Sequence, residues 1–114
     1  MKEEVKIVPK VWGCEEWIVN NDKYCGKLLK IKKGAQSSLH YHIKKMETFY
    51  CIKGQVRLEI DGKGYILNPY SRPKTILQGQ MHQFGGISDA TLLEISTHHD
   101  DNDVVRLSGS KGGK

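Results

Sequence analysis

The chain has 114 residues, 38% of them hydrophobic, and a net charge of +5. This length accommodates one compact domain, and no run approaches the roughly 18 consecutive apolar residues that a membrane span requires. The charged N-terminus, residues 1–10, is not followed by the apolar run of a signal peptide. These features predict a cytoplasmic protein with no membrane contact.

The distribution of charge and of cysteines excludes further classes. Lysines are scattered among acidic residues, without the arginine-rich block or the aromatic signature of a nucleic-acid-binding protein. We therefore expect no nucleic-acid partner, and the excess of positive charge favours small anionic ligands instead. Cys14, Cys25 and Cys51 are odd in number and form no C-x-x-C pair, so reduced thiols are expected.

Alternating hydrophobicity with a period of two is the dominant local pattern along the chain. Residues 27–32 alternate, residues 48–52 are rich in β-forming side chains, and residues 55–60 place their three apolar side chains on one face of a strand. Asp61-Gly62 follows the last of these runs and predicts a tight hairpin turn.

Glycine-rich turns separate these short runs, and no helical repeat is present. Many short strands of this kind predict an all-β domain in which two sheets pack as a sandwich or barrel, and 114 residues suit an eight-stranded jelly roll. We assign residues 1–107 to this single domain. Residues 108–114 have no apolar side chain and are rich in glycine, so a flexible C-terminal tail is expected there.

The most informative stretch spans residues 34–54 and has the spacing G-x5-H-x-H-x4-E-x6-G. His40 and His42 are two apart on an expected strand, so both imidazoles point to one face, and Glu47 begins the next strand opposite them. His82 lies on a later strand and supplies a fourth donor. Three imidazoles and a carboxylate suit one divalent ion, Mn, Fe, Co, Ni or Zn, and leave positions open for water or substrate.

This spacing resembles the first motif of the cupin family at every defined position. The family's second motif, P-x-G-x2-H-x3-N, is kept at Gly79 and His82, whereas Leu77 and Gly86 stand in place of its proline and asparagine. The resemblance implies a double-stranded β-helix, the cupin jelly-roll barrel. It also implies that one metal ion is held by His40, His42, Glu47 and His82.

Both ends of the chain resemble sugar-handling cupins. Residues 10–16, K-V-W-G-C-E-E, are similar to the K-P-W-G-x-x-E entry of type II phosphomannose isomerase and mannose-1-phosphate guanylyltransferase cupins. Residues 93–96 and 100–106 resemble the I-E-V-Q and E-D-D-I-V-R segments that close those domains. The pattern H-x-H-x2-K-x-E also resembles that of D-lyxose isomerases, in which a lysine at the position of Lys45 takes part in acid–base chemistry. These resemblances imply a mannose-6-phosphate isomerase-like enzyme of carbohydrate metabolism.

Aldose–ketose isomerisation moves a proton or a hydride between C1 and C2, and either path profits from a metal on adjacent oxygens and a nearby proton carrier. Lys45 and Glu94 are the candidates for this catalytic role. Lys45 lies two residues before Glu47 and can share its inward side. Glu94 alternates with Leu92 and Ser96 on a late strand, and the sequence leaves open whether it points inward or lies at a sheet edge.

Other polar and aromatic residues have two interpretations each. Phosphate or sugar hydroxyls could be bound by basic residues that are otherwise solvated, namely Lys30, Lys32, Arg57, Arg72 and Lys74. A sugar face could stack on aromatic residues that otherwise belong to the core, namely Trp17, Tyr41, Phe49 and Tyr50. His98, His99 and the aspartates beside them form either a second metal site or, as is usual for a polar run near a C-terminus, a surface loop.

The leading hypothesis is a metal-dependent sugar or sugar-phosphate isomerase with a small-molecule substrate. Two alternatives stay open. One is an iron(II)-dependent dioxygenase, which three histidines and a glutamate also suit, and the other is a non-catalytic carbohydrate-binding cupin. A barrel this short exposes sheet edges and an apolar sheet face, so a homodimer is expected.

Overall fold

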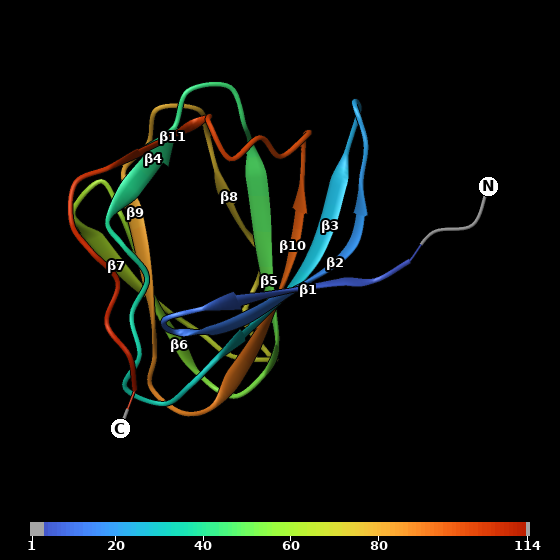
Figure 1. The fold of residues 1–114 in the computed structure, drawn as a ribbon. Helices are drawn as coiled ribbons and strands as arrows, with labels where there is room; N and C mark the ends of the chain where they lie inside the picture. The colour runs from blue at the N-terminus through green and yellow to red at the C-terminus, as the bar shows by residue number, and fades with distance from the viewer. Residues whose placement is uncertain (1–3, 114) are drawn as a thin grey trace.

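The computed structural model describes residues 4–113, in which eleven strands and no helix occur. The strands form two antiparallel sheets that face each other as a flattened barrel (Figure 1), the double-stranded β-helix that the sequence predicts. One sheet has the order β1-β2-β3-β10-β5-β8 and the other the order β11-β4-β9-β6-β7. The strands are β1 (Lys6–Lys10), β2 (Gly13–Asn20), β3 (Cys25–Ile31), β4 (His40–His42), β5 (Glu47–Lys53), β6 (Val56–Ile60), β7 (Lys63–Leu67), β8 (Lys74–Ile76), β9 (His82–Gly86), β10 (Ala90–Ser96) and β11 (Val104–Arg106).

The three strands expected from alternating or β-rich sequence are confirmed as β3, β5 and β6. In β6 the apolar residues Val56, Leu58 and Ile60 are all buried, as the period of two requires. The core lies between the sheets, where Trp12 and Phe84 pack edge to face with ring centroids 4.9 Å apart. Burial of alternate side chains therefore stabilises the barrel in the way the sequence indicates.

The register of the central strands divides the barrel interior into an apolar half and a polar half. Strands β3, β10 and β5 are neighbours, and their inward-facing residues align in rows because directly paired residues share a face. Successive rows are Leu29–Leu92–Cys51, Lys27–Glu94–Phe49 and Cys25–Ser96–Glu47. All nine side chains are buried, so charged groups occupy the same interior surface as the core.

Two local expectations can be compared directly with the structure. Asp61 and Gly62 form the predicted hairpin turn between β6 and β7, with φ of 49° and 82° and Ile60 paired to Lys63. The described chain has eleven strands where eight were expected. The additional ones include β1 and β11, which extend an edge of each sheet.

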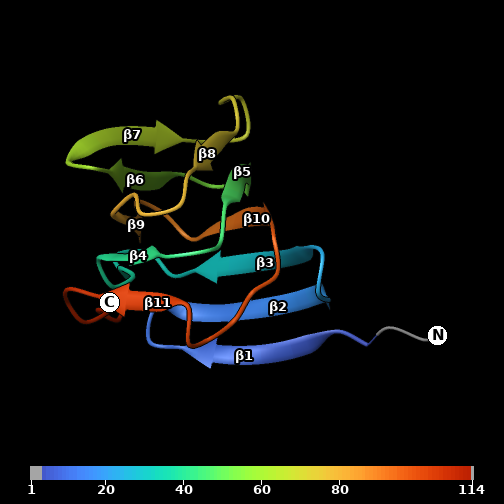
Figure 2. The same cartoon turned by 90° about the horizontal axis from the view of Figure 1, so that it is seen from above.

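The C-terminal segment lies against the barrel near the β1–β2 hairpin. Lys111 exchanges two backbone hydrogen bonds with Gln36, each with an N···O distance of 2.8 Å. Figure 2 shows β1 and β11 on the same side of the molecule. The flexibility expected of residues 108–114 stays a prediction, and residues 1–3 and 114 lie outside the described residues. Within residues 4–113, no helix has the length and apolar character needed to cross a membrane.

The turn between β5 and β6 depends on Gly54, which has a φ of 73°, and a Cβ there would lie 2.2 Å from the carbonyl oxygen of Asp89. We expect Gly54→Ala to lower the free energy of unfolding by about 2–4 kcal/mol, because backbone strain and a steric clash add. Gly62→Ala is the matched control: its φ is 82°, nothing lies within 4 Å of the added Cβ, and about 1 kcal/mol is expected. Urea denaturation measures both, and equal losses would contradict a role for the Asp89 contact.

Candidate metal centre

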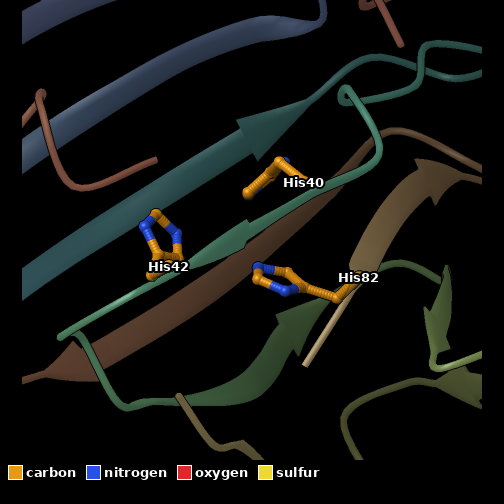
Figure 3. A group of neighbouring side chains, drawn as sticks. All are labelled: His40, His42 and His82. Carbon is orange, nitrogen blue, oxygen red and sulfur yellow. The ribbon is translucent and has the colours of Figure 1, made fainter. Parts of the chain in front are cut away.

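Three histidines from two adjacent strands converge inside the barrel (Figure 3). His40 and His42 lie two apart on β4 and share a face, and His82 at the start of β9 is paired directly with His40. One ring nitrogen of each lies within 4.8 Å of one in the other two, which is a spacing that a single metal ion could bridge. The pairing of β4 with β9 thus brings together residues that are far apart in the sequence.

Each of the three imidazoles is fixed by a hydrogen bond from its Nδ1 atom to a backbone carbonyl. His40 donates to Ser38 at 2.8 Å, His42 donates to Asp103 at 3.0 Å, and His82 donates to Gln80 at 2.9 Å. Because a carbonyl only accepts, Nδ1 carries the proton in each ring and Nε2 presents a lone pair. This arrangement, in which the backbone orients the ring and fixes its tautomer, is typical of histidine ligands to metals.

Glu47 begins β5 and points at the same place. Its side chain is 2% exposed, and Oε2 lies 3.3 Å from Nε2 of both His42 and His82. Oε2 and the Nε2 atom of His82 have no hydrogen-bond partner although both are buried. Facing acceptors at this distance need either a second proton on the imidazole or a cation between them. A divalent ion would satisfy the carboxylate and all three Nε2 atoms together, so the residues present fit a metal.

The histidines also have the protonation state that a metal requires. Burial lowers the pKa of His40 to about 3, and the neighbouring His82 adds to the shift. Burial lowers the pKa of His42 to about 4, although the Glu47 carboxylate opposes it. Both rings are therefore neutral near pH 7, and no proton competes for their Nε2 lone pairs.

Lys45 and Glu94 form a buried ion pair beside this group. Lys45 Nζ lies 3.0 Å from Oε2 of Glu94 and 3.8 Å from Oε1 of Glu47. Burial acts to lower the pKa of Lys45, but the Glu94 and Glu47 carboxylates outweigh it and hold this pKa above its ordinary value. Glu94 lies on β10, an interior strand of its sheet, and is 3% exposed, so the edge-carboxylate interpretation is wrong. Its neighbour Ser96 donates a hydrogen bond to the same oxygen at 3.2 Å.

The loop that follows β10 is exposed at His98, Asp100 and Asp101, as a surface loop would be, but His99 and Asp103 point to the site. His99 accepts a hydrogen bond at Nδ1 from Lys45 Nζ, 3.1 Å away, and donates one from Nε2 to Asp101 at 2.8 Å. Burial, followed by the ammonium groups of Lys45 and Lys27, lowers the pKa of His99, in agreement with a neutral ring. His98 is exposed and donates to the carbonyl of Asn21 at 2.7 Å.

Asp103, in the same loop, orders the turn that connects His42 with Glu47. Its buried carboxylate accepts hydrogen bonds from the backbone N–H groups of Ile43, Lys44 and Lys45 at 2.9–3.2 Å. Its backbone carbonyl is the acceptor for His42 Nδ1. The resemblance of residues 93–106 to the closing segments of sugar-handling domains is the sequence signal that could have indicated this role.

Lys27 is a second buried lysine near the site, and the sequence did not single it out as a site residue. Lys27 is 1% exposed, its Nζ atom lies 3.3 Å from Oε1 of Glu15, and it sits over the Trp17 ring, 4.2 Å from the centroid. The Trp17 Nε1–H donates to the same Glu15 oxygen at 2.7 Å. The alternation of residues 27–32 placed Lys27 on the same face as Leu29, and this was the available signal.

A pocket of about 90 Å³ opens onto the centre. Its lining shows which of the basic and aromatic residues considered as ligand-binding candidates lie near the histidines. Its lining includes His40, His42, Lys45, Glu47 and Glu94. The basic residues considered for phosphate binding do not line it, namely Lys30, Lys32, Arg57, Arg72 and Lys74. Among the aromatic candidates, Phe49 is a core residue that also lines the pocket, Trp17 is covered by lysines, and Tyr50 points outward.

Comparison with known proteins agrees with the fold. Residues 27–69 match the family model described as Cupin domain. The chain is similar to an RmlC-like cupin from Shewanella frigidimarina, with a TM-score of 0.77 and 14% identity over 87% of this chain and 88% of that one. It is also similar to the capsular polysaccharide assembling protein CapF from Staphylococcus aureus, with a TM-score of 0.78 and 16% identity over 95% of this chain and 33% of that one. The chain thus matches the cupin-domain model over residues 27–69 and shares the double-stranded β-helix fold with these structures.

The chain is also similar in sequence to a curated protein. A mannose-1-phosphate guanylyltransferase from Sinorhizobium fredii is 28% identical over 101 residues, which cover 85% of this chain. This chain spans 20% of the length of that relative. The similarity therefore extends over most of the cupin domain and a small part of the larger enzyme.

Metal binding can be measured by titrating the protein with Mn²⁺ or Co²⁺ while thermal unfolding is followed. We expect either ion to raise the unfolding temperature, because an ion that binds only the folded state stabilises it. His82→Ala removes a donor and should weaken binding by more than about tenfold, since loss of even an outer partner of a ligand costs that much. His98→Ala, at an exposed histidine outside the group, should bind as the wild type does. Unchanged affinity in His82→Ala would contradict the site.

The role of Asp103 predicts a combined loss of stability and of metal affinity. Asp103→Ala leaves backbone N–H groups of the turn without their acceptor, so we expect a loss of about 2–4 kcal/mol in the free energy of unfolding. Metal affinity should fall about tenfold or more, because the turn positions His42 and Glu47. Asp22→Ala, at an exposed aspartate, should change stability by less than about 0.5 kcal/mol. A stable variant with unaltered metal affinity would exclude this positioning role.

Proposed function

We propose that this cupin is a metal-dependent isomerase that interconverts the aldose and ketose forms of a sugar or sugar phosphate. The observation that carries the proposal is the buried Lys45–Glu94 pair, 3.0 Å apart, in the pocket that His40, His42 and Glu47 also line. Burying a charged pair costs free energy. Beside a metal centre that is open to a pocket, such a pair can transfer protons to and from a substrate, which gives its burial a functional reason.

The two side chains are suited to the two halves of a proton transfer. Isomerisation removes a proton from the carbon next to the carbonyl and returns one to the neighbouring carbon through an enediol, while the oxygens gain and lose protons. The Glu94 carboxylate is the base for carbon. The Lys45 ammonium, stabilised by two carboxylates, is the proton donor to oxygen. Ser96 and His99 hold the pair in place through the hydrogen bonds described above.

The metal would be held by His40, His42, Glu47 and His82. When bound, a divalent ion such as Mn, Fe, Co, Ni or Zn would polarise the carbonyl and hydroxyl oxygens of the substrate and make the adjacent carbon more acidic. Three imidazoles and one carboxylate leave room for such oxygens. The residues of this chain that face the same space, Lys45 and Glu94, would then orient the substrate and move its protons.

The names of the similar proteins support a carbohydrate ligand. One is a mannose-1-phosphate guanylyltransferase and another assembles a capsular polysaccharide. The homodimer and the cytoplasmic location stay predictions. The exposed side chains of Tyr50, Ile52 and Ile95 on the outer face of the larger sheet support the homodimer, because a second copy could cover them.

Proton exchange at C2 of aldoses, ketoses and their phosphates, followed by NMR in D2O with the metal-loaded protein, tests the proposal. We expect exchange with and without air, because isomerisation consumes no oxygen. Glu94→Gln and Lys45→Met should each reduce the rate by about a hundredfold or more, as the loss of general acid–base catalysis does. Lys53→Met, at an exposed lysine at the end of β5, should have no effect.

Two results would contradict the isomerase. Absence of proton exchange with every sugar tested would favour the non-catalytic carbohydrate-binding protein. Turnover that stops under nitrogen would indicate the dioxygenase. Metal content measured on each variant separates loss of chemistry from loss of the metal.

A further inference from the structure

Two basic side chains at the mouth of the pocket have no part in the proposed chemistry. Lys10 ends β1, the edge strand of the larger sheet, and Arg106 ends β11, the edge strand of the smaller sheet. Both line the pocket that contains His40 and His42, and both also line an adjoining groove together with Lys6. Asp101, which accepts a hydrogen bond from His99, lines both as well. The edges of the two sheets therefore meet at a rim with three basic side chains and one carboxylate.

The strand register directs Arg106 toward the metal centre. β11 pairs with β4 so that Arg106 is directly opposite His40, and Val104 is directly opposite His42. Directly opposed residues of antiparallel strands project from the same face. The guanidinium group is therefore on the inner side of the sheet, next to a metal-ligand position.

The charge balance of the pocket leaves these two groups available. Four basic and four acidic side chains line it. The inner lysines are paired, Lys27 with Glu15 and Lys45 with Glu94. Within residues 4–113, neither Lys10 nor Arg106 forms an ion pair. Because the side-chain charges cancel, a divalent ion gives the loaded pocket an excess of two positive charges.

We propose that Lys10 and Arg106 form a subsite for an anionic oxygen group, the phosphate or carboxylate of a sugar whose reacting end lies at the metal centre. The inference that the ligand is a sugar rests on the proposed function. The inference that it is anionic rests on the two basic side chains and on the charge balance of the pocket. Arginine binds such groups through two parallel hydrogen bonds and lysine acts as a point charge. A phosphate dianion would neutralise the excess charge completely, and a carboxylate would neutralise half of it.

The subsite is tested by calorimetric binding of inorganic phosphate, mannose 6-phosphate, a hexuronate and mannose to the metal-loaded protein. We expect at least one anionic sugar to bind more than about tenfold tighter than mannose, and the tighter of the two identifies the group. Arg106→Gln and Lys10→Gln should each weaken the anionic ligands about tenfold and leave mannose within about twofold. Arg72→Gln is the control, because it removes the same charge at an exposed site outside the pocket.

Three results would overturn the subsite: equal affinity for mannose and both anionic sugars, no binding of any anion at millimolar concentration, or the same effect from Arg72→Gln as from Arg106→Gln. These outcomes are separate from the fate of the isomerase. Selective binding of an anionic sugar without exchange at C2 would reject the isomerase and keep the subsite. Exchange without selectivity would reject the subsite and keep the isomerase.

Discussion

The burial of the Glu47 carboxylate against two histidine nitrogens is the constraint on which the rest of the structure depends. A carboxylate oxygen and an imidazole lone pair that face each other at 3.3 Å without a partner are unfavourable in a protein interior. A divalent ion would remove the conflict, and hydrogen bonds from Nδ1 of His40, His42 and His82 to backbone carbonyls already orient the three rings for it. Binding of the ion would therefore be coupled to folding, because the barrel sets the positions of the donors and the ion would balance the charge of Glu47.

The same β-sheets provide the apolar core and the reactive groups. Inward-facing residues of β3, β10 and β5 form rows. Along β10, Leu92 belongs to the apolar core, and Glu94, the next inward-facing residue, belongs to the candidate site. The sheet register fixes Glu94 on β10, and Lys45, in the turn between β4 and β5, is held by the hydrogen bond from its backbone N–H to Asp103. The pocket is consequently small and polar, and Lys10, Arg106 and Asp101 lie where it adjoins the outer groove.

The chain closes the site with its C-terminal part. Asp103 accepts hydrogen bonds from the turn between β4 and β5, and its carbonyl fixes His42, while His99 contacts Lys45. A segment that is polar and near the terminus thus controls the geometry of ligands about sixty residues earlier in the chain. Arg106 ends β11, the strand that follows this loop, and lines the same pocket.

By itself, the sequence determined the all-β architecture, the strands around the motif, the Asp61-Gly62 turn and the three histidines that meet at the centre. These features depend on period-two patterning and on fixed local spacing, which a sequence displays directly. The tertiary structure decided which charged residues are inside. Lys27 and Glu94 look like ordinary strand residues until pairing with neighbouring strands places them in the interior, and His99 and Asp103 become part of the site only because the last loop folds back over β4. Such contacts depend on the register between strands that are distant in the sequence. The residues of one strand do not indicate which strand it pairs with.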